Sequence, residues 1–222
     1  MKKFVALILA AAAPCVAGAK LLTGNAVMAS ESAQIAALEK VLNDGNADIT
    51  VSAKSAYLMD ANTGYKIFAS GENDRRPIAS MTKITLLLLT FESVDRGELS
   101  LDEDIVVSEN ASKMGGSQVF LRNGGTYKAG DLIKSIVVAS ANDASVAIAE
   151  RLYGSVSECV RQMNLKAESL GLKNTLYANV TGLPAPMQYS SAKDVAIIFS
   201  NLIKHEKYFD YCLLYTSDAA DD

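Results

Sequence analysis

Residues 77–89, "PIASMTKITLLLL", place a serine three positions before a lysine at the start of a strongly apolar run. Positions i and i+3 lie on one face of a helix, so the Ser80 hydroxyl and the Lys83 ammonium can meet. One interpretation is structural: Ser80 starts a helix, and Lys83 extends its charge into solvent. The other is chemical, because a serine hydroxyl is a good nucleophile only when a neighbour takes its proton. Lysine can be that base if burial, here beside the leucines of 86–89, depresses its pKa.

The S-x-x-K spacing alone does not decide between these interpretations, because a second copy occurs at 190–193. An S-x-N pattern is also present twice, at 140–142 and at 108–110. Context separates the copies. The pair at 80–83 leads an apolar helix, and 140–142 falls in a break between two apolar helical patterns, where a hydroxyl and an amide could line a pocket. By contrast, 108–110 follows a strand in an acid-rich stretch, and 190–193 opens an ordinary amphipathic helix.

The composition bounds the fold and the class of partner. With 222 residues, of which 50% are hydrophobic, the chain can bury a sizeable core in one domain. The formal net charge is −4 and no basic stripe occurs, which argues against nucleic-acid binding. The three cysteines and one histidine form no CxxC motif or Cys/His cluster, so no metal site is expected.

The N-terminus, "MKKFVALILAAAAPCVAGA", has two lysines, an apolar run and then small residues. That order is typical of a secretory signal, and the run is too short for a comfortable permanent membrane span. Small residues at 17–19 and at 27–29 both fit the cleavage rule, and we favour the second. We therefore expect residues 1–29 to be an export signal and the remainder to be exported.

The rest of the chain reads as a hairpin followed by a series of helices. A glycine-containing turn separates two strand-like runs within 55–70, and "DIVVSE" predicts a short strand. Helical periodicity predicts helices over 32–44, 80–95, 129–140, 143–154, 160–172 and 191–209. Strands before helices, without βαβ signals, favour an α+β fold with a helical cluster on an antiparallel sheet. A sheet needs three or more strands, so this one is short of strands.

Five segments follow one another along the chain: "RRPIASMTKI", "GGSQVFL", "VVASANDASVAIAE", "MNLKAESLGLKNT" and "NVTGLPAPMQYSSAKDVAII". In that order they resemble the D-alanyl-D-alanine carboxypeptidases, which are penicillin-binding serine peptidases of the bacterial cell wall. The resemblance covers roughly residues 45 to 210. It implies a β-lactamase/transpeptidase-like fold, a location at the periplasm or extracytoplasmic face of the membrane, and no metal or organic cofactor.

The resemblance also implies a role for each motif residue. Ser80 would form an acyl-enzyme with the penultimate D-alanine of a peptidoglycan pentapeptide and release the terminal one. Lys83 would accept the proton of Ser80, Ser140 would relay a proton to the leaving amine, and Asn142 would hold the substrate amide. The implied partners are peptidoglycan stem peptides and, as acylating inhibitors, β-lactam antibiotics.

This sequence departs from the family pattern in two places. The third family motif, K-T-G, is absent, and the nearest string, Lys128-Ala129-Gly130, precedes the Ser140 motif. The last residues, "CLLYTSDAADD", carry no family pattern. We therefore expect 30–211 to be an incomplete peptidase domain whose C-terminal strands are missing, and 212–222 to be a non-native or disordered tail. Membrane association is expected only of a full-length parent.

Four rival functions remain open on the sequence. A D,D-endopeptidase would use the same motifs, and the missing K-T-G allows an inactive module that only binds penicillin or peptidoglycan. A β-lactamase would need a carboxylate for deacylation, and no Glu-x-x-Leu-Asn string follows Ser140. A Ser-His-Asp hydrolase would have to use His205, which we expect on the surface of a polar helix face.

Overall fold

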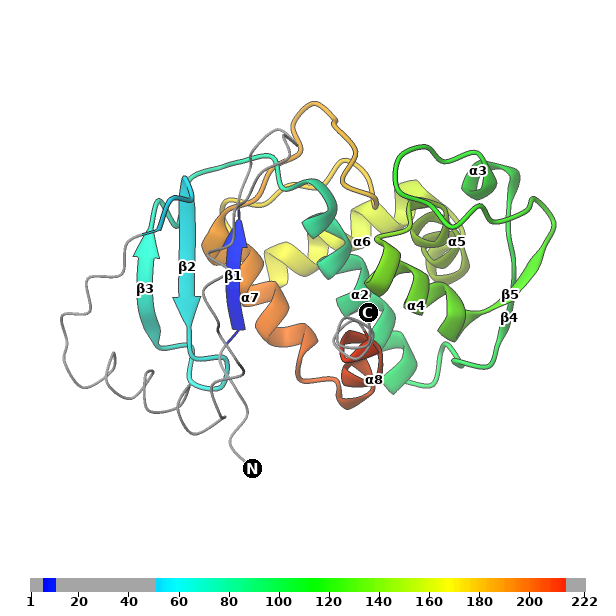
Figure 1. Cartoon of the computed structure of the whole chain (residues 1–222), viewed down its shortest axis with the longest axis horizontal. Coiled ribbons are helices and arrows are strands. Elements are labelled where there is room, and N and C mark those ends of the chain that lie inside the picture. The colour runs from blue at the N-terminus through cyan, green and yellow to red at the C-terminus, as the bar shows by residue number, and fades with distance from the viewer. Residues whose placement is uncertain (1–5, 11–50, 215–222) are drawn as a thin grey trace, which may run out of the picture.

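Helix α2 (Thr82–Asp95) runs through the middle of the structure, and the computed structural model describes residues 6–10 and 51–214 (Figure 1). Its side chains are buried on nearly every face, and Leu86 and Phe91 are fully inaccessible to solvent. A helix that is apolar all round is stable only inside a core. The run predicted at 80–95 therefore forms the buried axis of the fold, with a 3₁₀ turn, η1 (Ala79–Met81), before it.

The predicted hairpin is confirmed as strands β2 (Ser55–Met59) and β3 (Lys66–Ser70), which pair in antiparallel fashion. In the turn between them, the Asp60 carboxylate accepts hydrogen bonds from the backbone N–H and the hydroxyl of Thr63. Strand β1 (Ala6–Ala10) pairs with the other edge of β2, so the strand order is β1-β2-β3. Residues 6–10 belong to the predicted export signal, and the rest of that signal and the predicted helix at 32–44 lie outside the described residues.

Helix α7 (Ala192–Leu202) covers one face of this sheet (Figure 1). Tyr57 and Met59 of β2 pack there against Ala196 of α7, and all three side chains are buried. Because α7 also packs along α2, it joins the sheet to the central helix. The larger core, which contains α2, is a separate cluster of buried residues.

The far end of the molecule holds a second sheet and a group of helices (Figure 1). Strand β4 (Asp104–Val106) confirms the strand predicted in "DIVVSE" and pairs with β5 (Thr126–Lys128), which the sequence did not predict. Three residues beside two glycines are too few for a pattern to predict a strand. Helices α4 (Ala129–Ala139) and α5 (Asn142–Tyr153) pack against this sheet, and α3 (Glu109–Ser112) and α6 (Val156–Ser169) pack against α5.

The helix predicted at 191–209 stops earlier, at Leu202, and this part of the prediction is wrong. The chain then forms a 3₁₀ turn, η2 (Glu206–Tyr208), and a short helix, α8 (Phe209–Cys212). The turn directs Tyr208 onto Phe91 of α2, with ring centroids 5.6 Å apart in an edge-to-face arrangement. Burial of that ring decides the break, since the local pattern alone would continue the helix. Of the predicted tail at 212–222, Cys212 thus ends α8, and 215–222 lie outside the described residues.

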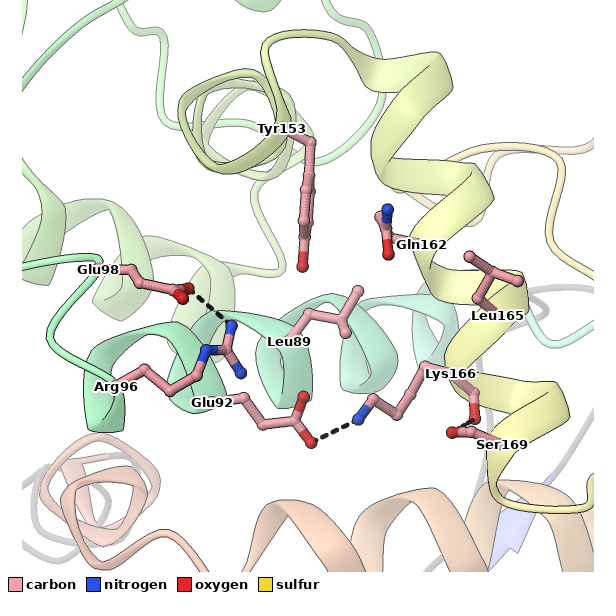
Figure 2. A pocket seen from close by; sticks show the side chains of 9 residues that line it. All are labelled: Leu89, Glu92, Arg96, Glu98, Tyr153, Gln162, Leu165, Lys166 and Ser169. Atoms are coloured by element: carbon pink, nitrogen blue, oxygen red, sulfur yellow. Dashed lines mark hydrogen bonds and ion pairs between the residues drawn. The ribbon is translucent and has the colours of Figure 1, made fainter.

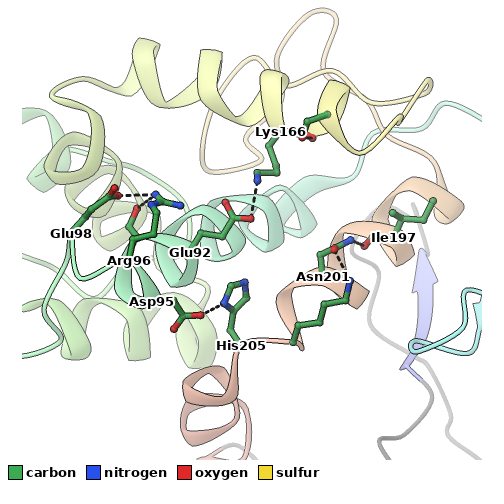
Figure 3. Close-up of polar contacts among 11 residues, drawn as sticks. Glu92, Asp95, Arg96, Glu98, Lys166, Ile197, Asn201 and His205 are labelled. Carbon is green, nitrogen blue, oxygen red and sulfur yellow. Dashed lines mark hydrogen bonds and ion pairs between the residues drawn. The ribbon is translucent and has the colours of Figure 1, made fainter.

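His205 is partly exposed, but it lies in the connection between α7 and η2 and not on the polar helix face predicted for it. Its side chain is 15% exposed, and its Nδ1 lies 2.5 Å from Oδ2 of Asp95 (Figure 3). Asp95 is the last residue of α2, about 18 Å along the helix axis from Lys83 at a rise of about 1.5 Å per residue. His205 therefore ties the C-terminal segment to the far end of α2 and has no contact with Ser80.

The predicted α+β class, with helices beside an antiparallel sheet, is confirmed by these elements. Within residues 6–10 and 51–214, no helix is both long and apolar enough to cross a membrane. Over the same residues, no group of three or more His, Cys, Asp or Glu side chains is arranged to hold a metal ion.

Candidate active site

Ser80 and Lys83 are in hydrogen-bond contact. Lys83 Nζ lies 3.1 Å from Ser80 Oγ and donates a second hydrogen bond, of 2.6 Å, to the carbonyl oxygen of Thr181. Neither η1 nor α2 has a side-chain cap at its N-terminus, so the Ser80 hydroxyl is not used in capping. Ser80 is exposed, whereas Lys83 is only 3% exposed. Ser80 does lie in the turn that leads into α2, but Lys83 does not extend into solvent, so the structural interpretation is wrong for Lys83.

The environment of Lys83 makes its neutral form more populated than that of a lysine in water. Burial lowers the pKa of Lys83 from 10.5 to about 8, because a charged ammonium loses hydration inside the protein. At pH 7 a group with that pKa is neutral in about one molecule in ten. A neutral amine at hydrogen-bond distance from a hydroxyl can act as its general base.

Ser140 lies in the break between α4 and α5, and Asn142 is the first residue of α5. Ser140 has a left-handed backbone with a φ of +53°, a conformation that non-glycine residues rarely adopt outside special sites. Asn142 Nδ2 donates to the carbonyl of Gly115 over 2.7 Å. The Ser140 Oγ and the Asn142 Oδ1 are buried without a hydrogen-bond partner in the described part of the chain. A buried polar atom without a partner lowers the stability of the fold by about 1–3 kcal/mol, so a polar group that enters the site and pairs with either atom would be bound favourably.

One loop, residues 178–190, contacts the turn that carries Ser80. We call it the bridging loop. A Cβ atom built on Gly182 would lie 1.9 Å from the carbonyl oxygen of Ala79 and 2.8 Å from the backbone nitrogen of Ser80. Only a glycine allows so close an approach, so the backbone of the bridging loop lies directly against the turn.

The bridging loop also reaches the Asn142 side of the site. A Cβ atom built on Gly116 would lie 2.8 Å from Asn142 Nδ2 and 3.4 Å from the Leu183 side chain. Leu183 follows Gly182 in the chain. Consecutive loop residues therefore lie against the Ser80 turn and beside Gly116, next to the Gly115 carbonyl to which Asn142 donates. The structure therefore gathers the Ser80–Lys83 pair and Asn142 around one loop. Ser140 makes no described hydrogen bond to Ser80 or Lys83.

Two residues at the site were not found from the sequence. Thr181 supplies the carbonyl for Lys83 from a position 98 residues away, and no local pattern carries such a contact. Asp143 is fully buried, and its carboxylate accepts hydrogen bonds from the backbone N–H groups of Val119 and Leu121. An aspartate in the first turn of a helix is common, so the position of Asp143 in the sequence gives no sign of this role.

The duplicate motifs have structural roles. Ser108 caps α3, where its hydroxyl accepts a hydrogen bond of 3.0 Å from the backbone N–H of Ala111. The Ser190 hydroxyl lies 2.8 Å from Oγ1 of Thr175. Neither serine has a described lysine contact, which agrees with the sequence-based choice of the 80–83 pair.

A separate cavity of about 490 Å³ lies between α2, α5 and α6 (Figure 2). Glu92 pairs with Lys166 over 2.8 Å, and Arg96 pairs with Glu98 over 2.7 Å. The charged groups on its wall thus satisfy one another. The cavity contains none of the four motif residues.

Comparisons with known proteins show the family of the chain. Residues 39–219 match the profile of the D-alanyl-D-alanine carboxypeptidase family. The D-alanyl-D-alanine carboxypeptidase DacF of Bacillus subtilis is 45% identical over 159 residues, which are 72% of this chain and 41% of that protein.

Solved structures give the same result. The D-alanyl-D-alanine carboxypeptidase DacD from Francisella tularensis superposes with a TM-score of 0.73 at 32% identity, over 75% of this chain and 40% of that one. Penicillin-binding protein D2 from Listeria monocytogenes, in its ampicillin-bound form, gives a TM-score of 0.65 at 26% identity, over 74% and 68%. The chain thus spans about two fifths of the length of DacF and DacD. It belongs to the D-alanyl-D-alanine carboxypeptidase family.

Proposed function

We propose that the site performs serine-type D-alanyl-D-alanine carboxypeptidase chemistry, with Ser80 as nucleophile and Lys83 as its base. The observation that carries this proposal is the 3.1 Å contact between Lys83 Nζ and Ser80 Oγ, made by a lysine that is 3% exposed. The substrate is a peptidoglycan stem peptide that ends in D-alanyl-D-alanine. The products are terminal D-alanine and the shortened peptide.

In the first half-reaction, neutral Lys83 takes the proton of the Ser80 hydroxyl while Oγ bonds to the carbonyl carbon of the penultimate D-alanine. The tetrahedral intermediate then collapses, and the bond to the nitrogen of the terminal D-alanine breaks. That nitrogen needs a proton to leave as an amine, and Ser140 relays to it the proton that Lys83 took from Ser80, so Lys83 is neutral again. The unpaired Ser140 Oγ and Asn142 Oδ1 support these roles, because a substrate amide would supply the missing partners.

In the second half-reaction, water attacks the ester carbonyl on Ser80 and loses a proton, and Ser80 Oγ takes one back. Acid and free hydroxyl form, so atoms and charge balance over the cycle. Asn142 holds the substrate amide through both steps. None of the steps needs a metal ion or an organic cofactor.

The same proposal covers the partners and the location of the protein. Penicillin-binding protein D2 was solved in an ampicillin-bound form, which supports β-lactams as acylating inhibitors of this chain. Residues 1–29 act as an export signal, and the peptidase region at 30–211 works at the periplasm or extracytoplasmic face of the membrane.

The test uses a fluorescent penicillin on the purified chain. Labelling of the wild type, lost in Ser80→Ala and Lys83→Ala, supports the acylation site. The second S-x-x-K supplies matched controls, because Ser190→Ala and Lys193→Ala remove the same atoms at the rejected pair and should keep the label. Label that persists in Ser80→Ala refutes the assignment.

Product analysis then separates the rival functions. Release of D-alanine from a pentapeptide identifies a carboxypeptidase, and cleavage of cross-linked peptide dimers identifies an endopeptidase. Labelling without either product favours a binding module without turnover, which the absence of K-T-G from the sequence makes a specific alternative.

A further inference from the structure

The carbonyl group that holds Lys83 is itself held by a side chain. The Asn179 Oδ1 accepts hydrogen bonds from the backbone N–H of Thr181 over 3.1 Å, from its hydroxyl over 3.2 Å and from the N–H of Gly182 over 2.7 Å. Its Nδ2 donates to the carbonyl of Leu183 over 2.8 Å. A single amide therefore bonds three consecutive residues of the bridging loop, including the one that contacts Lys83.

A second amide supports the first. The Gln188 Oε1 accepts from the backbone N–H groups of Ala178 and Asn179, each over 3.0 Å, and its Nε2 donates to the carbonyl of Leu183 over 3.2 Å. Asn179 and Gln188 thus hold the bridging loop from inside, although neither touches Lys83 or Ser80. Loops carry few regular backbone hydrogen bonds, so side-chain amides of this kind determine where the loop carbonyls point.

We propose that Asn179, backed by Gln188, is the positioning residue for the candidate base: it fixes the Thr181 carbonyl against Lys83 Nζ and so aims the amine at Ser80. The catalytic meaning of that geometry rests on the function proposed above. The position of Lys83 against the Thr181 carbonyl is tested separately from activity, through the pKa of Lys83.

The chemistry explains why the carbonyl matters to a neutral base. A neutral amine has two N–H groups and one lone pair. When one N–H donates to the Thr181 carbonyl, the lone pair can face Ser80, and the 3.1 Å contact then runs from hydroxyl to nitrogen. Without the carbonyl, the flexible lysine side chain turns among several rotamers, and the lone pair is aimed at Ser80 only part of the time.

Two substitutions of Asn179 should move the pKa of Lys83 in opposite directions. Asn179→Ala releases the Thr181 carbonyl, which accepts a hydrogen bond from the ammonium form, so the pKa of Lys83 falls further. Asn179→Asp keeps an acceptor for the loop but adds a negative charge near the ammonium, so the pKa rises by about one pH unit. A residue with a merely structural role would not produce this pair of opposite shifts.

The measurement is an NMR titration of the Lys83 ε-methylene signal in the ¹³C-labelled full chain, assigned with Lys83→Arg. The matched control is Asn201→Ala, because Asn201 also donates its amide to a backbone carbonyl, that of Ile197 on α7 (Figure 3). Opposite shifts in the two Asn179 variants, with none in the control, support the proposal. A pKa of Lys83 in both variants equal to that in Asn201→Ala overturns it. The same spectra report folding, and Asn179→Asp carries the test if Asn179→Ala unfolds.

The rate of penicillin labelling is the second test of the positioning role of Asn179. Asn179→Ala should acylate about 100-fold more slowly across the pH range, although more of its Lys83 is neutral, because orientation is lost. Asn179→Asp should be about tenfold slower at pH 7 and recover at higher pH, because only the neutral fraction of Lys83 has changed. Wild-type rates in Asn179→Ala would overturn the positioning role. If the wild type takes no label while the NMR shifts occur, the proposed function fails and the positioning of Lys83 stands.

Discussion

Replacing Gly182 by alanine adds one methyl group where the bridging loop lies against the Ser80 turn. The new Cβ would lie 1.9 Å from the carbonyl oxygen of Ala79, and real Cβ contacts are essentially never below 3.0 Å. The loop and the turn must therefore separate by at least 1.1 Å, the difference between these two distances. Ala79 already has a φ of +45°, so its backbone has little freedom to move away.

Two contributions set the expected loss of stability for Gly182→Ala. The φ of +85° at Gly182 costs alanine about 1 kcal/mol, and forcing a packed contact apart adds about 2 kcal/mol. A destabilisation of about 3 kcal/mol lowers the Tm of a chain of this size by about 6–12 °C. The displacement also shifts Ser80 from Lys83, so penicillin labelling should fall by about 100-fold.

The assay is thermal unfolding by circular dichroism, with Gly97→Ala as the matched control. Gly97 has a similar φ of +72°, but nothing lies within 4 Å of the position that its new methyl group would occupy. The control therefore isolates the backbone contribution of about 1 kcal/mol, or about 2–4 °C in Tm. Equal Tm values for the two variants would refute the close contact between the bridging loop and the Ser80 turn.

Three further predictions concern single side chains. Burial lowers the pKa of Lys83 from 10.5 to about 8, so the contribution of this side chain to folding stability is present above pH 10.5 and is lost as pH falls through 8. Urea unfolding of the wild type and of Lys83→Met should therefore show the wild type gaining relative stability from pH 7 to pH 10. A constant difference between their free energies of unfolding would contradict the burial. Burial also raises the pKa of the Cys159 thiol to about 12. In native protein, iodoacetamide at pH 8 should therefore modify Cys212 faster than Cys159, which peptide mapping would measure. The two rates should be equal only after unfolding. Asp143→Ala leaves the N–H groups of Val119 and Leu121 without the carboxylate that accepts from them, so the free energy of unfolding should fall by about 1–3 kcal/mol. Trypsin should then cut faster after Arg122. Unchanged cleavage would argue that Asp143 does not hold this loop.

The helices were predictable because their apolar periodicity is a local property. The runs at 129–140 and 143–154 correspond to α4 and α5 within about one residue at each end. The pattern failed at 191–209, where the contact of Tyr208 with Phe91 overrides local helix propensity. Strand β5 was missed for a similar reason: it exists only through its partner β4.

The candidate site was predictable only as far as its contacts are close in sequence. Ser80 and Lys83 are three residues apart, so helical geometry brings them together without knowledge of the fold. The Thr181 carbonyl and the Gly182 contact come from a loop about 100 residues later. The loop falls between the helices predicted at 160–172 and 191–209, but only the packed structure determines which group the loop presents to the lysine.

Helix α2 is held at both ends, and this arrangement sets an order of local opening. At its start, Lys83 bonds the bridging loop, and at its end Asp95 and Phe91 hold the C-terminal segment. Regions with few buried contacts open locally at a lower free energy than the core, so their amide hydrogens exchange first. We therefore expect the backbone amides of α2 to be among the slowest to exchange with deuterium, and those of the exposed part of the bridging loop around Met187 to exchange much earlier. The Lys83 amine would then stay in its folded position while the exposed part of the loop opens and closes.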